Sequence, residues 1–204
     1  VPLKKRYPQG GEKQLIDAVI RRQVASGALP ISTGAVVQNV GTVYAVYEAV
    51  QKNKPLLERV VTVTGKMLQK PSNLLVRIGT PMIDLINHAG GMPEDTGKVI
   101  GGGPMMGRAL VNTEVPVAKG SSGLLLLNRK ESTRRPMRDC IRCGKCVGVC
   151  PMGLNPAFIM RDTVAKNWDS CEKMNVADCI ECGSCSFTCP ANRPLLDYIR
   201  QAKK

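Results

Sequence analysis

The spacing of hydrophobic residues along this chain changes several times, and each spacing predicts a different element. Between Gly41 and the pair Lys54-Pro55, hydrophobic residues recur at intervals of three and four, as they do on one face of a helix. These residues are Val43, Val46, Tyr47 and Val50. We therefore expect residues 1–55 to consist of loops and helices, with the last helix ending before the proline.

From Arg59 onward, hydrophobic and polar residues alternate, which is the spacing of half-buried strands. The alternating residues are Val61 and Val63, followed by Leu74, Val76 and Ile78. A short helix should follow, with Thr80 as its N-cap, Pro81 as its first residue and Gly90-Gly91 as its C-cap. Further strands are predicted at 99–100, 115–117 and 124–127. Together these elements predict an α+β roll of about 70 residues.

The last third of the chain contains an internal repeat. CIRCGKCVGVCP at residues 140–151 returns as CIECGSCSFTCP at residues 179–190. Between the copies, Asn155-Pro156 predicts a helix N-cap followed by a first-turn proline. The residues Ala157, Met160, Val164 and Trp168 have helical spacing. We expect Phe158, Trp168 and Phe187 to belong to the core of this region, with exclusion of water from a site as the alternative.

Both copies have the spacing C-x2-C-x2-C-x3-C-P, which is typical of proteins that hold two cubane [4Fe–4S] clusters. Three cysteines on one tight loop bind one cluster, and the fourth reaches the other cluster. The predicted ligands are Cys140, Cys143, Cys146 and Cys189 for cluster I, and Cys179, Cys182, Cys185 and Cys150 for cluster II. Gly144 and Gly183 lie between the second and third cysteines, where a positive φ is expected. Cys171 lies outside both motifs and should pack as a small hydrophobic residue on a helix.

Composition and charge narrow the function further. The 204 residues carry a formal net charge of +13, which suits an acidic protein partner, an anionic membrane surface or nucleic acid. Nine cysteines without a secretory signal favour a reducing compartment and metal binding over disulfides. No apolar run is long enough to cross a bilayer, so any membrane association is expected to be peripheral. Because the chain begins with Val1, we expect it to be a piece of a longer protein.

A zinc-bearing module that binds nucleic acid is the alternative of a different class. Two C-x2-C pairs can hold Zn²⁺, and basic residues near the first motif would contact phosphates. These residues are Arg134, Arg135, Arg138, Arg142 and Lys145. Zinc requires neither the third cysteine of each motif nor the trailing C-P, so the spacing favours iron–sulfur clusters. The basic residues then suit docking to an acidic partner or an anionic leaflet.

Several segments together resemble the RnfC family of the Rnf-type electron transport complex. They are GGGPMMG at 101–107, VPVAKGSSGLLLL at 115–127, and the paired cysteine motifs that end in CPANRPLLDYIRQAK. That family is similar to the flavin-bearing, NADH-oxidising subunit of respiratory complex I. The resemblance implies a remnant of a Rossmann-like flavin/NADH domain at 1–55 and an SLBB-like β-grasp domain at 56–131. It also implies a mainly helical ferredoxin-like domain with two clusters at 132–204.

The resemblance extends to a part of the flavin site. YPQGGEKQLI at 7–16 and VVQNVGT at 36–42 resemble the closing portion of the flavin domain, and by position Glu12, Asn39 and Thr42 would line the FMN pocket. The upstream glycine-rich segment on which the family holds FMN and nicotinamide is missing from this chain. FMN and NAD(H) are therefore expected only in the full-length subunit.

The implied function is electron transfer within a larger complex. The two clusters would relay electrons between ferredoxin and NAD⁺ with coupled ion transport, and this chain would have no catalytic residue of its own. The implied partners are the other subunits of the complex and ferredoxin, with no nucleic acid, at the cytoplasmic side of the cell membrane. A soluble flavin and iron–sulfur reductase of the cobalamin reductase type shares this domain combination and is the closer alternative.

Overall fold

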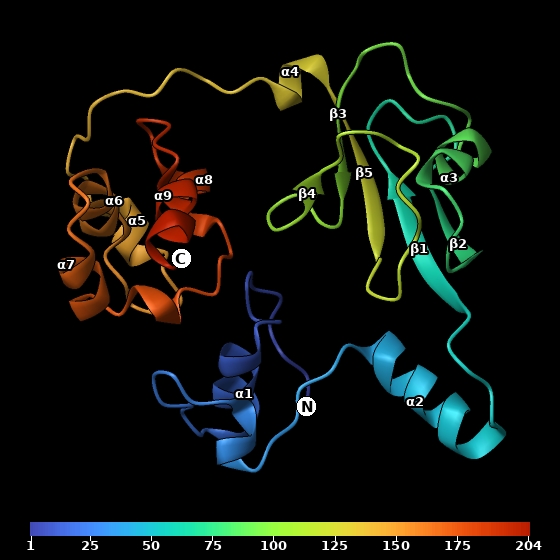
Figure 1. The fold of residues 1–204 in the computed structure, drawn as a ribbon, viewed down its shortest axis with the longest axis horizontal. Helices are drawn as coiled ribbons and strands as arrows, with labels where there is room; N and C mark the ends of the chain where they lie inside the picture. Colours follow the sequence, from blue (N-terminus) through green and yellow to red (C-terminus); the bar gives the residue numbers. More distant parts are fainter. The chain divides into compact units, whose positions relative to one another are not determined.

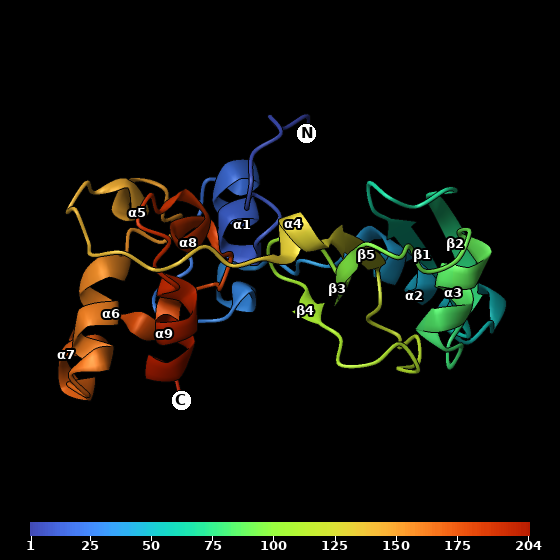
Figure 2. The ribbon, with the colours of Figure 1, turned by 90° about the horizontal axis from the view of Figure 1, so that it is seen from above.

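The computed structural model describes residues 1–204 and divides the chain into two compact units. One unit joins residues 1–37 to residues 135–204, and the other consists of residues 38–134 (Figures 1 and 2). The first is helical and contains both cysteine motifs, whereas the second contains all five strands. The predicted α+β class is therefore confirmed. No helix combines the length and apolar composition needed to span a membrane.

Residues 38–134 form one mixed sheet with helix α3 (Met82–His88) packed on one face (Figure 1). The strands are β1 (Glu58–Thr64), β2 (Ser72–Arg77), β3 (Thr96–Gly101), β4 (Arg108–Ala109) and β5 (Gly123–Asn128). Their order across the sheet is β2-β1-β5-β3-β4. β1 and β5 are parallel, and every other neighbouring pair is antiparallel. A mixed sheet that grips one helix is the arrangement expected of a β-grasp domain.

The core of this unit follows from the alternation in the sequence. Val61 and Val63 of β1 and Val76 of β2 are buried, and Leu85 and Ile86 of α3 pack in the same cluster. Alternate side chains of the strands therefore pack against the helix. Full burial of one such side chain contributes about 1.5–3 kcal/mol, so this shared core holds the helix to the sheet.

Two local predictions in this unit were wrong. Pro81 occupies the N-cap position of α3, and no side chain caps the helix, so Thr80 is not its N-cap. The segment around Pro116 forms no strand, because proline has no N–H group to continue a ladder. A single bridge joins Pro116 to Pro81 instead. Gly90 and Gly91 follow the helix with φ of 106° and 89°, as predicted for its C-terminal end.

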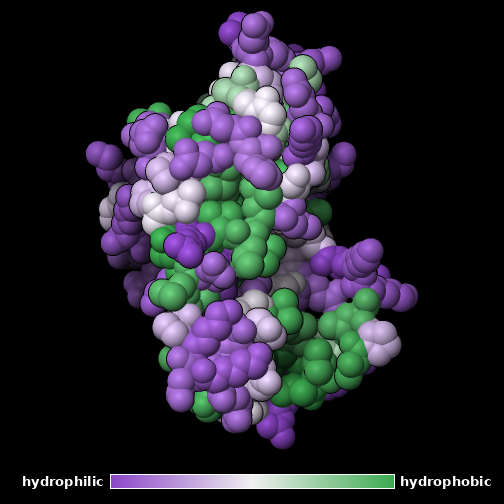
Figure 3. Space-filling view, turned by 90° about the vertical axis from the view of Figure 1, so that its right-hand side faces the viewer, coloured by the Kyte–Doolittle hydropathy of each residue, from purple (hydrophilic) through white to green (hydrophobic).

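Helix α2 (Val40–Lys52) confirms the helix predicted after residue 41. Its N-cap is Asn39, whose side chain accepts a hydrogen bond of 2.9 Å from the backbone N–H of Gly41. Its apolar face is exposed, since Val43, Val46, Tyr47 and Val50 are 49–69% exposed. Figure 3 views this side of the chain and shows hydrophobic side chains gathered at the surface. The spacing thus predicted the helix without predicting its burial.

The unit that contains the cysteine motifs is built from short helices. They are α1 (Glu12–Ile20), η1 (Pro30–Thr33), α5 (Lys145–Gly148), α6 (Pro156–Val164), α7 (Trp168–Lys173), η2 (Val176–Asp178), α8 (Ser184–Thr188) and α9 (Leu195–Ala202), while α4 (Arg129–Ser132) ends the other unit. α6 and α9 lie side by side (Figure 2). Ile159, Met160, Leu195 and Ile199 are fully buried between them. As predicted, Asn155 caps α6, Pro156 is its first residue, and Cys171 is buried on α7.

The aromatic residues of this unit were wrongly predicted to form its core. Phe158, Trp168 and Phe187 are 51%, 46% and 81% exposed. Val164 of the predicted helical stripe is also exposed, because α6 ends there and α7 begins only at Trp168. In a single helix through both segments, the residues of the stripe would lie on one face. Because the chain breaks between α6 and α7, Trp168 lies on a separate helix.

Candidate metal centres

The two cysteine motifs adopt the same backbone conformation. In each loop, the residue before the second cysteine has a positive φ, which is 53° at Arg142 and 56° at Glu181. The following glycines, Gly144 and Gly183, have φ of 72° and 77°, as the sequence predicted. A short helix begins directly after each glycine, namely α5 in the first loop and α8 in the second. The sequence repeat is therefore also a structural repeat.

The eight motif cysteines line two separate cavities of this unit. One cavity has a volume of about 610 Å³ and is lined by Cys140, Cys143, Cys146 and Cys189. The other is narrow, about 20 Å³, and is lined by Cys150, Cys179, Cys182 and Cys185. Each cavity thus takes three cysteines from one motif and the last cysteine from the other motif. This is the division that the spacing predicts for two clusters with crossed ligands.

Burial raises the pKa of several of these thiols, and thiols of the opposite motif add to the rise. The pKa of Cys185 is raised to about 11 by burial. Burial also raises the pKa of Cys179, with a further contribution from Cys150, and that of Cys146, with a further contribution from Cys189. The last cysteine of each motif therefore lies near cysteines of the other motif. Because metal binding requires thiolates, the bound metal has to offset this cost of ionisation.

The donor set suits an iron–sulfur cluster. No group of three or more His, Cys, Asp or Glu side chains is placed to hold a single metal ion. A [4Fe–4S] cluster is a body of iron and sulfide atoms, so its four ligands have to enclose a cavity. Four thiols line the first cavity, which has a volume of about 610 Å³. Four other thiols line the second and smaller cavity, together with Leu154, Leu196 and Ile199.

The surroundings of the first cavity are open and basic. Cys140 and Cys143 are exposed to solvent. The cationic residues that line the cavity are Arg142, Lys145, Arg161 and Arg193, and no aspartate or glutamate is among its lining residues. Phe158 lies there as well, with the Arg161 guanidinium 4.8 Å from the centre of its ring.

The loop of the second motif is instead held by the first residues of the chain. The Tyr7 hydroxyl donates a 2.6 Å hydrogen bond to the backbone carbonyl of Cys182, and its pKa is raised by burial and by the nearby Cys182. Asp178, directly before the first cysteine of this loop, accepts a 2.6 Å hydrogen bond from Ser26 and lies 3.6 Å from the Lys13 ammonium. The Ser26 hydroxyl, followed by the Lys13 charge, lowers the pKa of Asp178. No local sequence signal predicts these contacts, because the partners are more than 150 residues apart.

The glutamate of the second loop is paired within its own unit. Glu181 lies 2.7 Å from Arg200 and 3.1 Å from Lys203, both near the end of the chain. The hydrogen bond from Arg200 is the main cause of the lowered pKa of Glu181. The second loop therefore presents a neutralised carboxylate at the position where the first loop presents Arg142.

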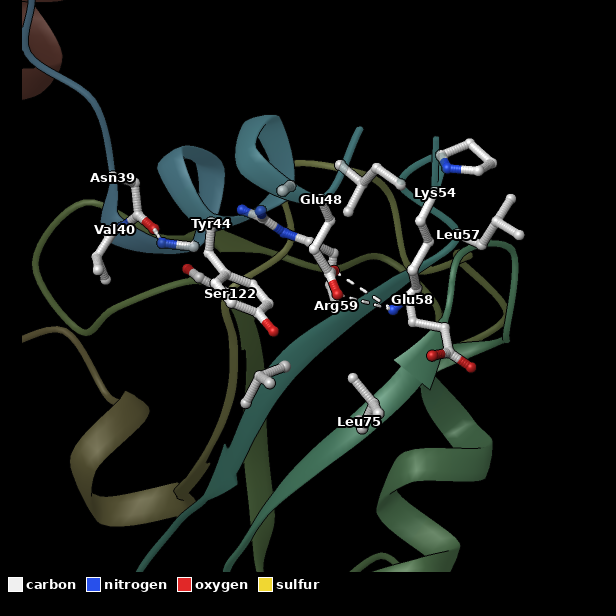
Figure 4. Close-up of a pocket in the computed structure, with 15 residues that line it drawn as sticks. Asn39, Val40, Tyr44, Glu48, Lys54, Leu57, Glu58, Arg59, Leu75 and Ser122 are labelled. Carbon is white, nitrogen blue, oxygen red and sulfur yellow. Dashed lines mark hydrogen bonds and ion pairs between the residues drawn. The ribbon is translucent and has the colours of Figure 1, made fainter. Parts of the chain in front are cut away.

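The three residues predicted to line an FMN pocket fall in different parts of the structure. Glu12 begins α1 in one unit, whereas Asn39 and Thr42 belong to the other. Asn39 lines a cavity of about 430 Å³ beside α2, together with Glu48 and Lys54, which lie 3.3 Å apart (Figure 4). Thr42 is not among the lining residues of this cavity. A shared role of these residues in binding FMN stays a prediction.

Three protein-family models match consecutive parts of the sequence. The Nuo51 FMN-binding domain matches residues 1–48, the SLBB domain matches residues 60–109, and the 4Fe-4S dicluster domain matches residues 133–190. The SLBB match agrees with the β-grasp sheet, and the dicluster match covers both cysteine motifs. Iron–sulfur clusters are therefore the cofactors that this part of the chain is built to hold.

Similar proteins are subunits of ion-translocating complexes. The chain is 48% identical over 199 residues to the C subunit of the Na(+)-translocating ferredoxin:NAD(+) oxidoreductase complex of Acetobacterium woodii, which is 98% of this chain and 45% of that protein. It is 47% identical over 207 residues to the C subunit of the proton-translocating ferredoxin:NAD(+) oxidoreductase complex of Clostridium ljungdahlii, covering 100% of this chain and 45% of that protein. It is 43% identical over 198 residues to the C subunit of the ion-translocating oxidoreductase complex of Rhodobacter capsulatus. The matched residues are 97% of this chain and 38% of that protein. The chain thus spans less than half the length of these relatives.

Proposed function

Because this chain belongs, over the residues that it spans, to the RnfC family of ion-translocating oxidoreductase complexes, we propose that it relays electrons through two [4Fe–4S] clusters. FMN and NAD(H) bind only in the full-length subunit, where Glu12, Asn39 and Thr42 would contribute to the FMN pocket. The relay connects ferredoxin with NAD⁺, and the ion transport coupled to it takes place in other subunits. This chain has no catalytic residue, and its clusters carry electrons between ferredoxin and NAD⁺.

The division of the eight thiols between two cavities is the observation that supports this function. Cluster I takes Cys140, Cys143, Cys146 and Cys189, and cluster II takes Cys179, Cys182, Cys185 and Cys150. Because each loop supplies a ligand to both sites, the two clusters lie close together, as electron transfer between them requires.

The residues of the chain hold and orient the thiolates of both sites. When bound, the clusters supply one-electron carriers. Gly144 and Gly183 let each loop turn so that three cysteines face one cavity. The buried core between α6 and α9, which follow the two loops, fixes both loops to one rigid body. Such rigidity limits the movement of ligands when the charge of the site changes.

The place of this chain in the cell follows from the same proposal. Its partners are the other subunits of the complex and ferredoxin, and it sits peripherally at the cytoplasmic side of the membrane. The net charge of +13 supports association with acidic proteins or anionic lipid headgroups. Nucleic acid is not a partner in this proposal.

Pairs of cysteine substitutions test the crossed ligand sets. The single variants Cys143→Ser, Cys189→Ser and Cys150→Ser should each retain about four iron and four sulfide per chain, because each loses one cluster. The double variant Cys143→Ser/Cys189→Ser should still retain about four of each, since both residues serve cluster I. Cys143→Ser/Cys150→Ser should retain none. Cys171→Ala is the control and should keep both clusters, because Cys171 is buried in the core outside both cavities.

The opposite pattern in the two double variants would contradict the crossed assignment. If Cys143→Ser/Cys150→Ser kept one cluster and Cys143→Ser/Cys189→Ser kept none, each motif would hold its own cluster. Stoichiometric zinc without sulfide in the unmodified chain would contradict the iron–sulfur function altogether.

A further inference from the structure

The two equivalent cluster loops differ in charge at equivalent positions. Arg142 in the first loop has the same backbone conformation as Glu181 in the second, and Lys145 corresponds to Ser184. Glu181 is neutralised by two basic side chains, whereas neither Arg142 nor Lys145 has an ion-pair partner in the chain. The repeated fold therefore presents one neutral loop and one cationic loop.

The cationic loop is also the accessible one. Cys140 and Cys143 are exposed, whereas Cys182 and Cys185 are buried. Residues 7–26 contact the second loop and its flanks through Tyr7, Lys13 and Ser26. No residue of this N-terminal segment lines the cavity of the first loop. A protein that exchanges electrons with this unit can therefore approach cluster I more closely than cluster II.

The side chains around the first cavity have the character of a protein interface. Ile141 and Phe158 are 68% and 51% exposed, and they stand among cationic side chains. Of these, Arg161 is paired with Asp162 at 2.6 Å, so Arg142, Lys145 and Arg193 supply the uncompensated charge. Exposed apolar anchors among arginines are typical of protein–protein contact surfaces. Guanidinium groups bind carboxylates in a fixed two-pronged geometry, and complementary charge accelerates encounter with an acidic protein.

We propose that the rim of the first cavity is the docking surface for an acidic electron-carrier protein, and that cluster I is the cluster that exchanges electrons with it. This rim, called the cationic rim, consists of Ile141, Arg142, Lys145, Phe158, Arg161 and Arg193. One electron passes between the reduced centre of the carrier and cluster I, so that one is oxidised as the other is reduced, and no bond is formed or broken. The inference rests on the proposed function, since it requires cluster I to be present.

The docking proposal is tested by giving the first loop the sequence of the second loop. The variant Arg142→Glu/Lys145→Ser converts CIRCGKC into CIECGSC, a sequence that the second loop already folds with the same positive φ. The matched control is Lys166→Glu/Lys173→Ser, which changes the charge equally at exposed residues that do not line the cavity. Both are made in the full-length subunit, and iron, sulfide and the EPR spectra establish that both clusters remain.

The measured quantity is the dissociation constant for a purified acidic ferredoxin, by calorimetry at low and high ionic strength. At low ionic strength we expect the loop variant to bind about tenfold or more weakly than the unmodified protein, and the control to bind within about twofold. The difference should shrink at high salt. Equal weakening in both variants would overturn the proposal, because only total charge would then matter.

Two further outcomes would contradict the docking proposal or the proposed function. If the loop variant bound ferredoxin normally but lost binding to vesicles that contain phosphatidylserine, the rim would be a membrane surface and the proposal would be wrong. If the unmodified protein held no iron and sulfide, the proposed function itself would fail, independently of the docking result.

Discussion

The hydroxyl group of Tyr7 donates a 2.6 Å hydrogen bond to the backbone carbonyl of Cys182, a residue 175 positions later in the chain. Residues 1–37 and residues 135–204 belong to one compact unit, and this contact ties the start of the chain to the loop of the second motif. Residues 1–48 match an FMN-binding domain, so the contact joins a part of that domain to a proposed cluster ligand. The second loop is therefore the one whose properties should respond to changes at the N-terminus.

Replacing this tyrosine tests the contact. Tyr7→Phe removes one hydrogen bond to the Cys182 carbonyl, which contributes about 0.5–1.5 kcal/mol when formed. In a Cys143→Ser background, which retains only cluster II, we expect the EPR signal of the reduced cluster to shift. Cys150→Ser, which retains only cluster I, should give the same spectrum with and without Tyr7→Phe. A change confined to cluster I would contradict the contact, and the exposed Tyr44→Phe in the other unit is the control.

The positive φ of the loop glycines makes a second prediction. At Gly144, a Cβ atom would meet no protein atom within 4 Å, so the cost of Gly144→Ala is conformational. A left-handed conformation costs a residue with a Cβ roughly 1–2 kcal/mol. We expect Gly144→Ala to lose cluster I faster than the unmodified protein on warming. The loss is measured as a decrease in visible absorbance.

The matched control is Gly148→Ala, four residues further on. Gly148 ends α5 without a positive φ, and its Cβ would also meet nothing within 4 Å. Alanine is favoured over glycine in a helix by about 0.5–1 kcal/mol, so the rate of cluster loss should be unchanged or lower. Equal rates in the two variants would show that the backbone conformation at residue 144 is not limiting.

The core of the β-grasp unit gives a third prediction. Ile86 on α3 is fully buried against the sheet, and Ile86→Ala should lower the free energy of unfolding of this unit by about 2–5 kcal/mol. Amide hydrogen exchange of β1 and β5 reports this change directly. Leu75→Ala is the control, because Leu75 is 69% exposed on β2 and should change exchange little. Similar exchange in both variants would contradict the assignment of the core.

The sequence predicts the elements whose signals are local. The cysteine spacing is a direct signature, the glycines and the Asn155-Pro156 pair mark turns and helix starts, and alternation indicates β1 and β2. The short strand β4 was missed, since two residues of backbone pairing leave no hydrophobic pattern. The valines on either side of Pro116 favour a strand, but the missing N–H group of the proline prevents one.

What could not be predicted depends on contacts distant in the chain. Phe158 and Phe187 lie on exposed faces of α6 and α8, and hydrophobic spacing in such short helices does not report which face meets the core. The hydrogen bonds of Tyr7 and Ser26 join the chain end to the second loop, and no periodicity could pair them. The difference between Arg142 and Glu181 was visible in the repeat, but its meaning required their opposite surroundings in the fold.

The presence of two iron–sulfur clusters is tested by the inorganic content of the chain purified without oxygen. Iron, acid-labile sulfide and zinc are quantified per chain, and EPR spectra are recorded before and after reduction with dithionite. If the chain holds two [4Fe–4S] clusters, we expect about eight iron and eight sulfide, little zinc, and the interacting signals of two neighbouring reduced clusters. Stoichiometric zinc without sulfide would contradict this expectation.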